Sequence, residues 1–223
     1  MARKLTAEFI GTLFLVAAVV GSGIMAERLS PDDVGLQLFE NAFATAGALL
    51  ALILALGPVS GAHFNPVVSA AEVAHGRMTI TEAGQYAIAQ ISGGAVGAIT
   101  ANLMFALPAV EISEKSRAGF ELRFAEVVAT IGLLLVIYGV VAAGKPHYAA
   151  ATVAGYIGGA YFFTASTSFA NPAVTLARML SDTFAGIRPV DAAGFIAAQI
   201  VGGLIGIPLI RWLFGQPSPS SPE

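Results

Sequence analysis

Long apolar stretches alternate with short polar segments along almost the whole chain. Six of these stretches are long enough to cross a bilayer, which takes about 20 helical residues. They predict spanning helices near Leu5–Ala26, Leu36–Leu56, Ala83–Leu107, Leu122–Ala143, Tyr148–Thr167 and Ala192–Phe214. Two further apolar segments begin at Asn65 and Asn171 and are too short to cross, so they predict half-helices. The pattern indicates an all-α membrane protein.

Composition supports this assignment and excludes several function classes. The chain has 223 residues, of which 56% are hydrophobic and 11% charged, against about 25% charged residues in soluble domains. A net charge of −3 gives no basis for nucleic-acid binding. The absence of cysteine excludes disulfides, thiol catalysis and cysteine-ligated metals. His75 and His147 fall in predicted loops, so His63 is the only imidazole expected near the membrane centre, which argues against a histidine metal site.

The next features concern the two ends of the chain and its orientation in the membrane. Arg3 and Lys4 precede the first apolar stretch, as in a signal peptide, but five further spans and the embedded Glu8 favour an uncleaved first helix. With the N-terminus inside, five Lys and Arg residues fall on the inner side and six on the outer, so their distribution does not predict orientation. The Ser/Pro-rich segment Gln216–Glu223 predicts a disordered tail.

Two Asn-Pro turns stand 106 residues apart, as Asn65-Pro66-Val67 and Asn171-Pro172-Ala173. Each has Asn where a helix N-cap belongs and Pro where the first helical residue belongs. A helix that starts inside a membrane is tolerated only where its backbone lines a cavity or is buried in protein. The pair therefore predicts a pore with two half-helix N-termini at its centre. The alternative is that each Asn only caps its helix.

Other features are duplicated in the same order along the chain. Ala7–Thr12 (AEFIGT) matches Ala125–Thr130 (AEVVAT), and Tyr86–Gly97 (YAIAQISGGAVG) matches Phe195–Gly206 (FIAAQIVGGLIG). The chain thus reads as one channel domain over residues 1–215, with repeats at about 1–107 and 120–215. Each repeat contains three spans, and an odd number inverts the second repeat in the membrane relative to the first. The repeated glycines indicate close helix packing rather than a site.

Together these motifs resemble the aquaporin and glycerol-facilitator family, and the resemblance covers the chain to about Phe214. It implies six spanning helices and two half-helices, a homotetramer with one pore per subunit, and passive conduction of small neutral solutes without a cofactor. It also implies a bacterial inner-membrane protein with both termini cytoplasmic. By the same resemblance Glu8 and Glu126 brace the half-helix loops, with proton coupling as the alternative, since intramembrane carboxylates are functional by default. His63 would line the pore, with a packed, hydrogen-bonded histidine as the alternative.

The sequence departs from the family most strongly at the selectivity filter. Counting from the two Asn-Pro motifs places Thr45, Gly159, Ser168 and Val174 at the filter positions, and Val174 stands where most members carry arginine. All four side chains are small, and none is aromatic or charged, so we expect a wide constriction without a fixed guanidinium. Arg178 lies one turn farther along and either rings the outer mouth or pairs at the surface with Asp182 or a lipid headgroup.

This filter resembles a bacterial branch of the family that is often associated with arsenic resistance. The resemblance implies arsenous acid as the preferred solute, followed by glycerol-like polyols and water. A water channel and a general glycerol facilitator remain alternatives, and a coupled secondary transporter is a more distant one because inverted repeats also serve that class. No nucleophile is paired with a base at useful spacing, so we do not expect an enzyme.

Overall fold

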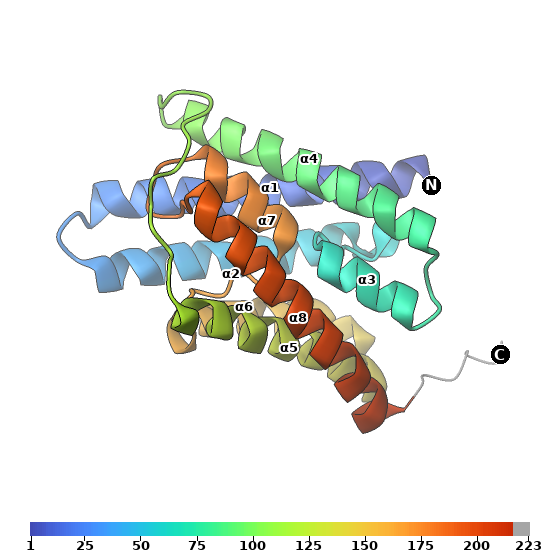
Figure 1. Ribbon diagram of the computed structural model, residues 1–223. Coiled ribbons are helices and arrows are strands. Elements are labelled where there is room, and N and C mark those ends of the chain that lie inside the picture. The colour runs from blue at the N-terminus through green and yellow to red at the C-terminus, as the bar shows by residue number, and fades with distance from the viewer. Residues whose placement is uncertain (216–223) are drawn as a thin grey trace.

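The computed structural model describes residues 1–215, which form a bundle of long helices around two short ones (Figure 1). The long helices are α1 (Ala2–Leu29), α2 (Val34–Ser60), α4 (Ile80–Met104), α5 (Phe120–Ala142), α6 (Ala149–Phe163) and α8 (Pro189–Phe214). The short ones are α3 (Pro66–Ala74) and α7 (Pro172–Ala177), and 3-10 turns η1 (Pro146–Tyr148) and η2 (Arg178–Leu180) precede α6 and follow α7. No strand occurs in the described residues, so the all-α prediction is confirmed.

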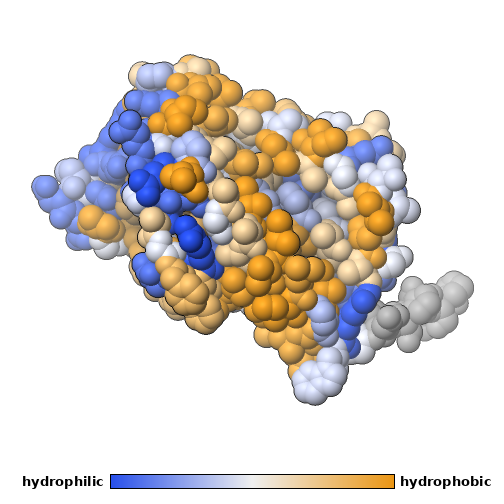
Figure 2. Space-filling model, in the orientation of Figure 1, coloured by the Kyte–Doolittle hydropathy of each residue, from blue (hydrophilic) through white to orange (hydrophobic). Residues whose placement is uncertain are grey.

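Five of the long helices, α1, α2, α4, α5 and α8, are long and apolar enough to cross a membrane. Helix α6 has only 15 residues, a length of roughly 22 Å at 1.5 Å per residue. The predicted end of this span at Thr167 is wrong, because the helix stops at Phe163 and positive φ angles at Thr167, Ser168 and Ala170 are incompatible with an α-helix. Figure 2 shows apolar side chains over the middle of the visible face and polar ones gathered at one end.

The two repeats make equivalent contacts. Helix α1 packs against α4 in the first repeat, as α5 packs against α8 in the second, and α2 packs against α6 between the repeats. Each half-helix contacts both α4 and α8. The N-terminus, the α3–α4 connection and the end of α8 lie at one end of the bundle, here the N-terminal face; the α4–α5 loop lies at the other, here the opposite face (Figure 1).

Glycines allow these helices to approach closely. A Cβ atom on Gly93 would lie 2.2 Å from the Phe9 carbonyl oxygen, and one on Gly97 would lie 2.3 Å from that of Leu13. Gly202 has the equivalent role in the second repeat, where a Cβ would lie 2.7 Å from the Thr130 Cβ. Small residues at such positions let two backbones come into contact in a membrane, where no water-driven collapse assists packing. The close contacts of α1 with α4 and of α5 with α8 hold the long helices in place around the half-helices.

Candidate functional site: a cavity through the bundle

Both half-helices begin where the Asn-Pro motifs predict. Asn65 is the N-cap of α3, and its Oδ1 accepts a hydrogen bond from the Val67 N–H at 3.0 Å. Asn171 is the N-cap of α7, and its Oδ1 accepts from the N–H groups of Ala173 at 3.0 Å and Val174 at 3.3 Å. Each Asn is followed by Pro at the first helical position, where no intrahelical N–H bond is lost.

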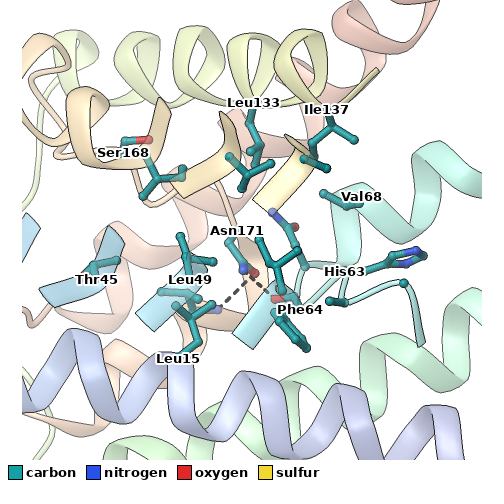
Figure 3. A pocket seen from close by; sticks show the side chains of 18 of the residues that line it. Leu15, Thr45, Leu49, His63, Phe64, Val68, Leu133, Ile137, Ser168 and Asn171 are labelled. Carbon is teal, nitrogen blue, oxygen red and sulfur yellow. Dashed lines mark hydrogen bonds between the residues drawn. The ribbon is translucent and has the colours of Figure 1, made fainter. Parts of the chain in front are cut away.

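The two Asn side chains also join the repeats. Asn65 Nδ2 donates to the Ala170 carbonyl, and Asn171 Nδ2 donates to the Phe64 carbonyl, both at 2.7 Å. Figure 3 shows Asn171 reaching the loop of the other repeat at Phe64. A carboxamide nitrogen has two hydrogens, so each Asn keeps one donor after this bond. The positive ends of the two helix dipoles therefore meet at one point, with two amide donors beside it.

Two fully buried carboxylates hold the loops that precede the half-helices. Glu8 accepts from the backbone N–H groups of His63 at 3.0 Å and Phe64 at 2.7 Å. Glu126 accepts from those of Phe169 at 2.9 Å and Ala170 at 2.8 Å. Each carboxylate also accepts from a glutamine of its own repeat, Gln90 for Glu8 at 2.8 Å and Gln199 for Glu126 at 2.6 Å. This symmetry is the geometry that a bracing role requires.

The same loops contain strained backbone. Ala62 and Phe64 have φ angles of 51° and 50°, and Ser168 and Ala170 have 50° and 48°. A non-glycine residue in this left-handed region costs of order 1–3 kcal/mol and persists only where its surroundings fix it. The hydrogen bonds to Glu8 and Glu126 are such surroundings.

A cavity of about 330 Å³ contains the meeting point of the half-helices. Both Asn65 and Asn171 line it, and apolar side chains from four long helices form much of its wall, among them Leu15, Leu49, Leu133, Ile137, Val153 and Ile157. In Figure 3, Thr45 and Ser168 lie to one side of Asn171 and His63 to the other. The cavity therefore extends from the meeting point toward both faces of the bundle.

Toward the opposite face, three of the four predicted filter residues line the cavity. Thr45, Ser168 and Val174 do so, and each is at most 5% exposed. The Ser168 hydroxyl has no hydrogen-bond partner within residues 1–215, which leaves it free to bind a solute.

The prediction for Gly159 is wrong. Gly159 is exposed and absent from the cavity lining, and a Cβ added there would meet no atom within 4 Å outside its own stretch of helix. Tyr161 takes its place, and its hydroxyl lies 3.1 Å from Thr45 Oγ1. Residues two apart on a helix point about 200° apart, so Val153, Ile157 and Tyr161 share the inner face of α6 while Gly159 points outward. Counting back from Asn171 missed this because it ignored the face that α6 buries.

Arg178 also lines the cavity, in agreement with the alternative that placed it at the mouth, and Tyr161 and Phe169 add aromatic rings to an end where the four filter positions predicted none. The Arg178 side chain is 2% exposed, its Nε donates to the Ala185 carbonyl, and its guanidinium carbon lies 3.4 Å from the centroid of the Phe169 ring. The alternative of surface pairing is wrong, because Asp182 instead accepts from Ser113 Oγ and the Glu114 N–H. The Arg178 Nη atoms make no hydrogen bond within the described residues, so they can donate to a solute.

Arg117, in the α4–α5 loop, contacts residues at this end of the bundle. Arg117 donates to the Gly186 carbonyl at 2.8 Å and lies 4.9 Å from the centroid of the Phe169 ring, which lines the cavity. Burial lowers the pKa of Arg117 to about 10, so Arg117 stays protonated at neutral pH, and burial also lowers the pKa of Lys115. Arg117 thus packs against a residue of the cavity wall.

Toward the N-terminal face, His63 lines the cavity as predicted by position, with Nδ1 3.1 Å from Ser69 Oγ and its ring 5.2 Å from that of Tyr86. It is therefore both a lining and a packed, hydrogen-bonded histidine. Sequence reasoning missed Glu72, Arg77 and Tyr138, which line the same end. The only sequence signal for these residues was the pair of opposite charges Glu72 and Arg77, five residues apart and shortly after the first Asn-Pro motif.

Comparisons with known proteins agree with this architecture. Residues 1–166 match the family described as "Major intrinsic protein". The chain is 46% identical to "Aquaglyceroporin AqpS" of Rhizobium meliloti over 100% of this chain and 97% of that protein, and 30% identical to "Aquaporin Z" of Photorhabdus laumondii over 97% and 99%. Its fold resembles the X-ray structure of the aquaglyceroporin from Plasmodium falciparum, with a TM-score of 0.72 at 23% identity over 96% of each chain. Because the family match spans most of the sequence and both bacterial relatives align along nearly their whole length, the chain belongs to the major intrinsic protein family.

Proposed function

We propose that the chain is a passive transmembrane channel for small uncharged solutes, one pore per chain. The observation that carries this proposal is the cavity that extends to both sides of the paired Asn65 and Asn171 amides. A neutral solute accepts a hydrogen bond from each amide in turn. A cation or hydronium meets two helix N-termini and the Arg178 guanidinium, which form an electrostatic barrier.

The preferred solutes in this proposal are arsenous acid and small polyols such as glycerol. Support comes from the small side chains of Thr45, Ser168 and Val174, which leave room beside the amides. Arsenous acid is uncharged at neutral pH and resembles a polyol in size and hydroxyl groups. The 46% identical relative carries the name aquaglyceroporin, which favours a polyol-conducting channel over a strict water channel.

A water channel is the second candidate, and Arg178 and Tyr161 favour it. Their side chains add a fixed guanidinium and an aromatic ring beside the small side chains of Thr45, Ser168 and Val174. A guanidinium is a strong, permanently charged donor, and a ring reduces the space for larger solutes. The two candidates therefore differ in the permeability ratio of glycerol to water.

We further propose that four copies assemble in a bacterial inner membrane with both termini cytoplasmic. Phe43, Phe120 and Trp212 are each at least 73% exposed, as expected of side chains that face lipid or a neighbouring copy. Chemical cross-linking and blue-native electrophoresis would test the tetramer, and a reporter fused at each end would test the orientation.

The function is tested with purified protein in liposomes. Stopped-flow light scattering measures permeability to water and glycerol, and uptake of radiolabelled arsenous acid measures the metalloid. We expect all three to exceed empty liposomes, with glycerol and arsenous acid raised most. A large water permeability with neither of the other two would reject the preferred solutes and leave the water channel, whereas no increase for any would reject the channel itself.

A further inference from the structure

The end of the cavity at the N-terminal face contains a cluster of polar side chains. The proposed function above assigns no role to this cluster. Glu72 comes from α3, Arg77 from the α3–α4 connection and Tyr138 from α5, and all three line the cavity. Glu72 Oε1 accepts from Arg77 Nη2 and from the Tyr138 hydroxyl, and Glu72 Oε2 accepts from Arg77 Nε, each at 2.7 Å. The cluster therefore joins the first half-helix to the second repeat.

Packing around Tyr138 fixes the geometry of this cluster. The Tyr138 ring stacks on His75 with centroids 4.4 Å apart, and the Arg77 guanidinium carbon lies 5.2 Å from the centroid of the same ring. Tyr138 itself is only 4% exposed. The hydrogen bond to Glu72 raises the pKa of Arg77, so Arg77 remains charged at neutral pH. A two-point ion pair of this kind also fixes the orientation of both side chains.

The cluster keeps both donors and acceptors available. A carboxylate has about four acceptor sites, and Glu72 uses three of them. The Tyr138 oxygen donates to Glu72 but accepts nothing within the described residues, and Arg77 Nη1 makes no hydrogen bond there. A molecule at this end of the cavity can therefore both donate and accept.

Neither the paired Asn amides nor Arg178 offers this combination, and the free Ser168 hydroxyl at the other end of the cavity is a single group rather than a cluster. The Oδ1 atoms of Asn65 and Asn171 accept from the helix backbone, so the two side chains present only N–H groups to a solute. Arg178 has no acceptor at all. A hydroxyl group both donates and accepts, and each buried hydroxyl proton left without an acceptor costs free energy.

We propose that Glu72, Arg77 and Tyr138 form a binding subsite for uncharged polyhydroxylated solutes at the N-terminal-face end of the cavity. The subsite rests on the proposed channel function and adds a second point of selection, separate from the Thr45, Tyr161 and Arg178 end. Two or more hydroxyl groups of a triol can form hydrogen bonds with this cluster at the same time. A solute of similar size that lacks one hydroxyl loses part of this binding.

Two variants remove polar atoms from the subsite and keep its shape. Tyr138→Phe removes only the hydroxyl and keeps the ring that contacts His75 and Arg77. Glu72→Gln keeps the side-chain length but replaces one acceptor oxygen with a donor. The matched controls are Tyr156→Phe, which removes a hydroxyl that donates to the Ala129 carbonyl away from the cavity, and Glu82→Gln, a partly exposed carboxylate in the first turn of α4 that does not line the cavity.

The measurement is the ratio of glycerol to 1,2-propanediol permeability in liposomes that contain equal amounts of folded protein. We expect Tyr138→Phe and Glu72→Gln each to lower this ratio by roughly three- to tenfold, the size of effect of one ordinary hydrogen bond. The two controls should keep the wild-type ratio. Dividing by the propanediol permeability cancels any general change in the number of open channels.

The outcomes separate the subsite from the channel. If the wild type conducts glycerol and both cluster variants keep its ratio, the subsite is wrong and the channel stands. If Tyr138→Phe does not fold, Glu72→Gln alone decides in the same way. If the wild type conducts neither solute, the channel function fails and the subsite fails with it.

Discussion

Replacing Glu8 with glutamine separates a bracing carboxylate from a proton-coupling one. Four donors converge on Glu8: Ser60 Oγ at 2.6 Å and the His63 N–H at 3.0 Å on Oε1, and the Phe64 N–H at 2.7 Å and Gln90 Nε2 at 2.8 Å on Oε2. Glutamine has one acceptor oxygen, so two of these buried donors lose their partner in either orientation of the amide.

The structure sets the size of this effect. A hydrogen bond to a charged group contributes about 1.5–3 kcal/mol, so the loss of two costs about 3–6 kcal/mol. Because the Ala62 and Phe64 backbone is strained, the released loop is expected to relax and withdraw Asn65 from the meeting point. We expect a lower unfolding midpoint in detergent and less folded protein in the membrane.

The assay is thermal unfolding of purified Glu8→Gln, with Glu111→Gln as the control because Glu111 is exposed in the α4–α5 loop. Glycerol permeability per folded protein is measured in parallel. A Glu8→Gln protein as stable as the wild type, but with flux lost or no longer sensitive to pH, would refute bracing. It would favour the secondary transporter.

Three further substitutions test the arrangement of the cavity and its frame. Val174→Arg adds a large charged side chain to the end of the cavity that Val174 lines. It narrows the pore and is expected to lower glycerol permeability more than water permeability, because the larger solute is excluded first. An unchanged glycerol-to-water ratio in stopped-flow measurements would remove Val174 from the filter. Gly159→Leu faces outward and is expected to leave that ratio unchanged, whereas Tyr161→Ala widens the cavity and raises it; the reverse result would restore Gly159 to the filter. Gly93→Ala forces α1 and α4 apart and is expected to lower the unfolding midpoint, while Gly47→Ala, whose Cβ meets nothing within 4 Å, does not; equal midpoints would contradict the packing account.

Features that depend on local chemistry could be predicted from the sequence. Asn65 and Asn171 cap helices because a side-chain oxygen followed by Pro suits a helix start in any surroundings. The family resemblance, carried by the matched Ala-Glu motifs, implied that Glu8 and Glu126 brace the loops, and hydropathy located the spans to within a few residues. The tail 216–223 lies outside the described residues.

Features that depend on packing could not be predicted from the sequence. The position of Tyr161 depends on which face of α6 is turned toward the cavity, and the number of residues between α6 and Asn171 does not reveal that face. Arg178 is buried because Ala185 and Phe169, from separate segments, provide its contacts. The Glu72–Arg77–Tyr138 cluster requires α5 to lie beside α3, and no local pattern encodes that proximity.

The most direct test of the central claim is the initial glycerol flux into liposomes as a function of the glycerol gradient, with and without an imposed proton gradient. A passive channel predicts a flux that depends on the glycerol gradient, proceeds in both directions and is unchanged by the proton gradient. Accumulation of glycerol against its gradient, driven by the proton gradient, would contradict the account and assign the chain to coupled transport.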